Sequence, residues 1–159
     1  MRARVLAIAL AAIAGLAIFG STGAFAQGVP LFAVLNGGNE CNGASPPLCR
    51  QGDLNAYGSA TIIFPTSTQI CWGIVVHGAT GVNAAHIHTG VTGVNGPIRI
   101  FLSPPSAPGG GSPGAAAGCR AVAAADSAAI KANPSGFYVN VHTTAGGGFP
   151  NGAVRGQLF

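Results

Sequence analysis

The sequence predicts an all-β protein, an antiparallel β-sandwich or barrel with one short helix. Short segments of alternating or β-branched residues recur along the chain and are separated by turns rich in Gly, Pro and Asn, a pattern typical of sandwiches and barrels. The 159 residues include only three acidic ones, Glu40, Asp53 and Asp126. So little charge disfavours helices stabilised by surface ion pairs.

The N-terminus has the pattern of an export signal. Two arginines precede an uncharged apolar run that ends at Phe19, and the small-x-small motif AFA follows at residues 24–26. We therefore expect residues 1–26 to be a signal peptide and residues 27–159 to form one domain that is secreted, periplasmic or held in the cell envelope. An uncleaved anchor is the alternative. No segment after the cleavage site is long and apolar enough to span a bilayer.

The expected domain carries little charge. Without Arg2 and Arg4 it has five basic and three acidic residues, a net charge of about +2, and no cluster of Lys or Arg. This distribution argues against nucleic acid or an anionic membrane surface as the partner. We expect an unidentified protein or surface instead.

Alternation and turn residues predict seven strands. Pro65 should end the second strand, and Trp72 in the third should lie in the core. The predicted strands span residues 31–35, 57–64, 70–77, 85–88, 98–102, 137–143 and 153–159.

Two segments between these strands have a different composition. Residues 103–118 are mostly Pro, Gly and Ser, which predicts a long flexible surface loop. Residues 121–133 are rich in Ala, with Asp126 near the start and Lys131 near the end. That arrangement predicts the single helix, which Asn-Pro should terminate.

An even number of cysteines in an exported chain favours disulfides. Three pairings are possible. Because Cys41 and Cys49 enclose a short loop, we favour Cys41–Cys49 together with Cys71–Cys119. A zinc-thiolate site is the weaker alternative, since no CxxC motif is present and the cysteines do not neighbour the histidines in sequence.

Three of the four histidines lie on polar strand faces. In AHIH, His86 and His88 point to one face because side chains alternate along a strand, and in YVNVHT His142 shares a face with Tyr138 and Asn140. If the faces meet, three imidazoles could hold one copper or zinc ion, more weakly as the pH falls through about 6.5. The alternative is a polar cluster in which imidazoles and backbone groups satisfy one another. His77 is expected at the surface.

Three motifs resemble the CHRD domain, which is named after chordin. They are LNGGNE, AHIHTGVTGVNGPI and GFYVNVHTTAGGGFPNGAVRGQL, and the resemblance covers residues 29–158. The chain departs from the family pattern in its cysteine loop after LNGGNE and in GAVRGQL where GEIRGQL is common. The resemblance implies an extracellular β-domain and no particular activity.

The order of the AHIH, VNVHT and closing Arg-Gly strands is also similar to the copper/zinc superoxide dismutases. This similarity implies an antiparallel Greek-key β-sandwich, immunoglobulin-like or superoxide-dismutase-like, in which the histidine strands lie side by side. By this analogy His86, His88 and His142 would be copper ligands and Arg155 would guide anions. The alternative for Arg155 is a buried ion pair or a fork to backbone carbonyls. No histidine and only one acidic residue lie between His88 and His142, so ligands for a second metal ion are lacking.

No catalytic residue is assigned. The chain has no GxSxG motif, and its three acidic residues do not form a convincing catalytic pair. We therefore expect a non-enzymatic binding or structural module of the cell envelope or extracellular space, with a possible mononuclear copper or zinc site. The competing function is a copper-dependent, superoxide dismutase-like redox enzyme.

Overall fold

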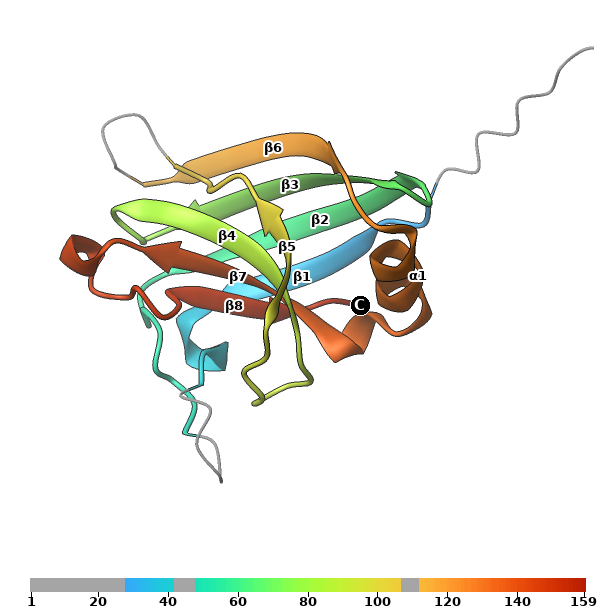
Figure 1. Ribbon diagram of the computed structural model, residues 1–159. Coiled ribbons are helices and arrows are strands. Elements are labelled where there is room, and N and C mark those ends of the chain that lie inside the picture. The colour runs from blue at the N-terminus through green and yellow to red at the C-terminus, as the bar shows by residue number, and fades with distance from the viewer. Residues whose placement is uncertain (1–27, 42–47, 107–111) are drawn as a thin grey trace, which may run out of the picture.

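Eight antiparallel strands form one sheet in the order β5-β4-β7-β8-β1-β2-β3-β6 (Figure 1). The computed structural model describes residues 28–41, 48–106 and 112–159, so the expected signal peptide at residues 1–26 lies outside the described residues. The elements are β1 (Leu31–Asn36), β2 (Tyr57–Thr66), β3 (Gln69–His77), β4 (Val82–Thr89), β5 (Ile98–Leu102), β6 (Gly114–Ala121), α1 (Ala124–Ala132), β7 (Phe137–Thr143) and β8 (Val154–Gln157), with 3₁₀ turns at Gly37–Asn39, Pro134–Gly136 and Ala145–Gly147.

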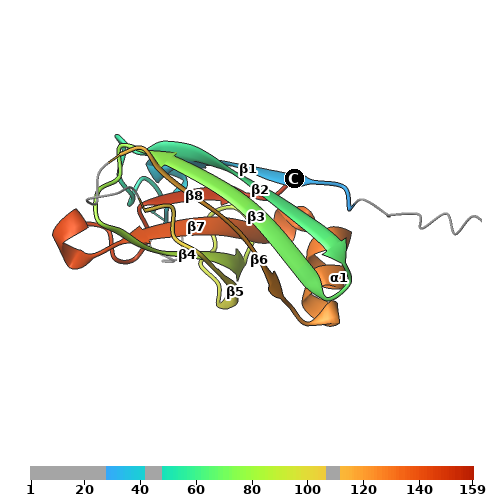
Figure 2. The same cartoon turned by 90° about the horizontal axis from the view of Figure 1, so that it is seen from above.

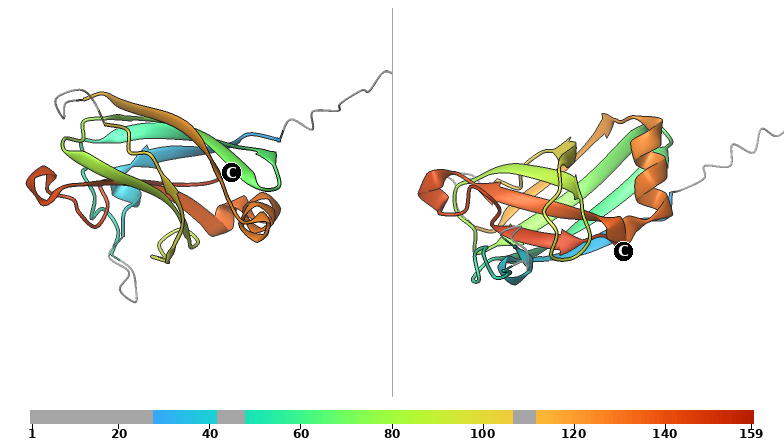
Figure 3. Two further views of the ribbon diagram at one scale, coloured as in Figure 1. Left: turned by 45° about the horizontal axis from the view of Figure 1, so that its top comes forward. Right: turned by 60° about the horizontal axis from the view of Figure 1, so that its bottom comes forward.

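The sheet curls until its two edge strands come close to each other (Figures 2 and 3). The guanidinium of Arg120 on β6 donates a hydrogen bond of 2.9 Å to the carbonyl of Phe101 on β5. The all-β prediction with one helix is confirmed. Hydrogen bonding places the eight described strands in one nearly closed sheet.

The core follows from the alternation along each strand. In β1, Leu31, Ala33 and Leu35 are buried while Phe32 and Val34 are exposed, because successive side chains point to opposite faces. Trp72 lies in the core as predicted, with 7 % of its surface exposed. The other large core side chains are Ile62, Phe64, Ile70, Ile74, Val76, Ile87, Ile100, Leu102, Ile130, Phe137, Val139, Val141, Val154 and Leu158.

Helix α1 lies at the end of the sheet opposite the β7–β8 turn (Figure 1). It buries Ile130 completely and begins later than the sequence predicted, because Ala121 belongs to β6. At its N-terminal turn, Asp126 accepts a hydrogen bond from Arg99 of β5. No helix within the described residues is long and apolar enough to cross a membrane.

The prediction of a flexible loop over residues 103–118 is wrong for its C-terminal part. Residues from Gly114 onward form β6, which pairs with β3 from Gln69 to Val76. Gly118 faces Trp72 in this pairing, and a Cβ there would lie 2.8 Å from the indole ring. The glycine therefore makes room for a core side chain. Pro65 also does not end β2, which continues to Thr66 through an irregular register.

Two disulfides join the cysteines in the pairs that the sequence favours. Cys71 and Cys119 face each other directly in the β3–β6 register, and their Cα atoms are 4.0 Å apart. Cys41 bonds to Cys49, and an isolated antiparallel bridge links the same two residues. The first bond ties β6 to the sheet, and the second anchors the segment that follows β1.

Candidate metal centre

Strands β4 and β7 bring the three predicted histidines together. The strands pair so that Ala84 faces His142 and His86 faces Asn140, which places all three imidazoles on the face of the sheet opposite Ile87. One ligand atom from each of the three lies within 4.8 Å of the others. The ring centroid of His86 is 5.5 Å from that of His88 and 5.0 Å from that of His142. His77, the fourth histidine, stacks on Tyr57 instead.

Backbone carbonyls determine which nitrogen carries the proton in two of the rings. His88 Nδ1 lies 2.9 Å from the carbonyl oxygen of Gly96, and His142 Nδ1 lies 3.1 Å from that of Pro150. A carbonyl oxygen can only accept, so each Nδ1 must donate its proton. The lone pair of each ring is therefore on Nε2, and backbone carbonyls commonly fix metal-binding histidines in this arrangement.

Each ring also has one buried nitrogen without a hydrogen-bond partner among the described residues. His86 Nδ1, His88 Nε2 and His142 Nε2 are buried and make no hydrogen bond with the described residues. Burial, together with the smaller effect of the neighbouring imidazoles of His142 and His88, lowers the pKa of His86 to about 4. Burial also lowers the pKa values of His88 and His142. The rings are thus neutral near pH 7, and neutral imidazole is the form that binds metal ions.

Aromatic side chains hold two of the rings in place. His86 meets the ring of Phe101 on β5 edge to face, with centroids 5.0 Å apart. His88 stacks on Tyr138 of β7 at the same distance, and the hydroxyl of Tyr138 accepts a hydrogen bond from the Gly96 amide. Tyr138 therefore contacts both His88 and the turn that supplies its carbonyl partner.

Arg155 is buried beside this centre and forms a fork to backbone carbonyls. Its Nη2 donates to the carbonyls of Val91 and Val94, at 3.0 and 2.9 Å, and its Nη1 donates to the side chain of Asn95. The guanidinium carbon lies 3.4 Å from the ring centroid of Tyr138. The arginine fastens the loop between β4 and β5 to β8, the structural alternative that the sequence left open for it.

Sequence reasoning missed several residues around the histidines. Tyr138 lies on the polar face of its strand, so alternation alone could have included it. Gly96 and Pro150 act through backbone carbonyls, which leave no signal in residue type. Glu40, in LNGGNE, accepts a hydrogen bond of 3.4 Å from the amide of Asn140, which is adjacent to His86 across the strand pair.

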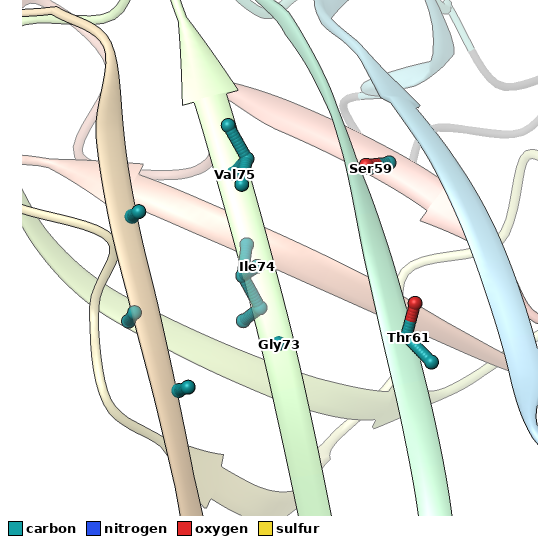
Figure 4. Close-up of a pocket in the computed structure, with 8 residues that line it drawn as sticks. Ser59, Thr61, Gly73, Ile74 and Val75 are labelled. Atoms are coloured by element: carbon teal, nitrogen blue, oxygen red, sulfur yellow. The ribbon is translucent and has the colours of Figure 1, made fainter.

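A separate hollow of about 460 Å³ lies over β2, β3 and β6 (Figure 4). Its lining contains no titratable side chain, so it offers no chemistry comparable to that of the histidines. The lining residues are Ser59, Thr61, Gly73, Ile74, Val75, Ala115, Ala116 and Ala117.

Comparison with known proteins identifies the family. No curated protein and no solved structure matches the chain significantly. The family model of the CHRD domain matches residues 31–158, a range that includes every strand of the sheet and all three clustered histidines. The chain therefore belongs to the CHRD domain family.

Proposed function

We propose that this CHRD-domain protein is exported and binds one Cu(II) or Zn(II) ion through His86, His88 and His142. The observation that carries this proposal is that each ring has a buried nitrogen without a hydrogen-bond partner while the three rings converge. Imidazole nitrogen is a good ligand for both metals. Three imidazoles leave a coordination position for water.

A self-satisfied polar cluster explains the same geometry less well. The Nδ1 protons of His88 and His142 already go to backbone carbonyls, so these two rings present only acceptors to each other. The single N–H of a neutral His86 could satisfy at most one of them, yet its Nδ1 makes no hydrogen bond. A metal ion would satisfy all three nitrogens at once.

We propose that the protein is a non-enzymatic binding or structural module of the cell envelope or extracellular space. Two disulfides fit an oxidising compartment. The partner would be a protein or surface rather than nucleic acid, because the few basic residues form no cluster, Arg155 is buried and Arg99 is bonded to Asp126.

A copper-dependent redox enzyme is the second candidate, since a mononuclear copper site with an open position could react with superoxide. The hydrogen bonds of Arg155 weigh against this function. An arginine that guides anions needs a guanidinium turned toward the metal and solvent, whereas this one is 1 % exposed and bonded to two carbonyls.

Copper titration of the protein lacking residues 1–26 tests the proposal. We expect one equivalent of Cu(II) to give an EPR spectrum with nitrogen coupling and to raise the melting temperature, with Zn(II) raising it as well. The triple variant His86→Ala, His88→Ala, His142→Ala should lose both responses. His77→Ala, which removes a histidine outside the cluster, should keep them.

Two results would overturn the metal site: unchanged EPR and melting temperature in the unsubstituted protein, or a copper response that survives in the triple variant. Rapid superoxide turnover that disappears on chelation would instead establish the redox enzyme. If copper binds and turnover is absent, the binding module stands.

A further inference from the structure

A polar cavity shares no residue with the metal centre but is linked to it through Glu40, which accepts a hydrogen bond from Asn140, the residue opposite His86. Its volume is about 400 Å³, within the range of pockets for small organic ligands. It opens where the segment after β1 meets the turn before β8. The lining consists of Glu40, Cys41, Gln51, Asn95, Asn151 and Gly152.

Glu40 is an under-satisfied buried carboxyl at this cavity. Only 3 % of the residue is exposed, and its Oε2 makes no hydrogen bond with the described residues. The side chain of Asn140 donates to Oε1 at 3.4 Å, a long contact, and its own Oδ1 has no partner. Gly152 makes room for the carboxyl, since a Cβ there would lie 2.5 Å from Oε2.

The nearest cation does not satisfy this carboxyl. Arg155 attracts Glu40 electrostatically, but the hydrogen bonds of its Nη1 and Nη2 go to Asn95 and to the carbonyls of Val91 and Val94. Burial raises the pKa of Glu40 to about 7 in spite of the arginine. Such a shift is typical of a carboxyl that burial removes from water, and it persists although the side chain of Asn140 and the backbone of Cys41 donate to the group.

The chemistry of the lining favours an organic cation over a metal ion. Calcium takes six to eight oxygen ligands, commonly from several carboxylates, and this cavity has one carboxylate. A primary ammonium group brings three donors and a positive charge, which suit one buried carboxylate. The amide side chains of Gln51 and Asn151 can both donate to and accept from hydroxyl groups.

We propose that this cavity binds a small hydroxylated molecule that carries a primary ammonium group, of the chemical class of the amino sugars. The ammonium group donates to Glu40, and the hydroxyl groups bond to the amides of the rim.

Glucosamine is the probe, with N-acetylglucosamine as the control that keeps the hydroxyls and lacks the charge. In ¹⁵N NMR titrations of the metal-free protein, we expect glucosamine to shift the backbone amides of Gln51, Asn151 and Gly152. Glu40→Gln keeps the shape and removes the charge, so binding should weaken by about tenfold or more. Asp126→Asn, which removes an acidic charge at α1, should leave the affinity unchanged.

A second variant keeps the test valid if Glu40→Gln does not fold. Gln51 and Asn151 are exposed rim residues, so the double variant Gln51→Ala, Asn151→Ala should fold and bind glucosamine more weakly. The proposal is overturned if glucosamine shifts none of these amides, if N-acetylglucosamine binds equally well, or if Glu40→Gln binds with unchanged affinity. Copper titration of Glu40→Gln should match that of the unsubstituted protein, so this site and the metal site can fail separately.

Discussion

The imidazole of His88 lies nearly parallel to the phenol ring of Tyr138, with the centroids 5.0 Å apart and the planes inclined by 12°. Arg155 contacts the same phenol ring, with its guanidinium carbon 3.4 Å from the centroid. Because β7 lies between β4 and β8 in the sheet, the two planar groups reach Tyr138 from opposite sides. One side chain thus supports a proposed metal ligand and the buried arginine together.

Replacing Tyr138 should separate the contributions of its ring and its hydroxyl. Tyr138→Ala should lower the free energy of unfolding by roughly 3–5 kcal/mol, as expected for a buried aromatic ring, and should weaken copper binding because His88 loses its support. Tyr138→Phe keeps the stack and loses the hydrogen bond from Gly96, at a cost of about 1 kcal/mol. Urea denaturation measures both, and equal stability of the two variants would contradict the proposed role of the stack.

Arg155→Lys should destabilise the fold although the charge is kept. Lysine cannot reproduce the fork to the carbonyls of Val91 and Val94, so hydrogen bonds from a charged donor would be lost at a cost of roughly 3 kcal/mol. Arg50→Lys, at an exposed position, is the control and should change stability by less than about 0.5 kcal/mol. Thermal denaturation reports the difference. An Arg155→Lys protein of unchanged stability that reacts more slowly with superoxide would favour anion guidance instead.

Glu40 should make stability depend on pH in a defined direction. Burial raises the pKa of Glu40 from 4.5 to about 7. The carboxyl ionises more readily in the unfolded chain, so the contribution of Glu40 to stability is full below about pH 4.5 and is lost as the pH rises toward 7. Glu40→Gln does not titrate, and its stability relative to the unsubstituted protein should increase by roughly 3 kcal/mol across that window.

The histidines titrate in both proteins, so the difference between the two urea titrations isolates Glu40. A difference that stays constant between pH 4.5 and 7 would show that the carboxyl is ionised in the folded protein throughout.

Local alternation explains why much of the fold could be predicted. A period of two residues decides which side chains of β4 and β7 share a face, and the sequence shows this alternation directly. The strand β6 could not be recognised in the same way, because the run Gly114 to Gly118 contains only Gly and Ala. Its strand conformation depends on pairing with β3, which is more than 30 residues away in sequence.

The candidate site, like the fold, could be predicted from the sequence only in part. Residue type and spacing were enough to select His86, His88 and His142. The carbonyls of Gly96 and Pro150 that accept from two of these rings were not predictable, because their positions depend on the geometry of two turns. The contact between Glu40 and Asn140 joins residues 100 positions apart, and no local pattern encodes such a contact.

Replacement by alanine should destabilise the protein at one glycine, Gly118 of β6, and have little effect at another, Gly73 of the neighbouring strand β3. Gly118→Ala would place a Cβ 2.8 Å from the ring of Trp72, and since the indole is packed in the core, the clash should cost about 1–3 kcal/mol. Gly73 lies on the outer face of β3 beside the hollow (Figure 4). The Cβ added by Gly73→Ala would meet nothing within 4 Å. Its effect should stay within about 0.5 kcal/mol.

Urea denaturation monitored by the fluorescence of Trp72, the single tryptophan of the chain, measures both variants. The indole emission of the folded protein should also change in Gly118→Ala and stay constant in Gly73→Ala, since only the first substitution reaches the ring. If Gly118→Ala were as stable as the unsubstituted protein with unchanged emission, β6 would not pack over Trp72. The room needed by the indole would then not explain the glycine at position 118.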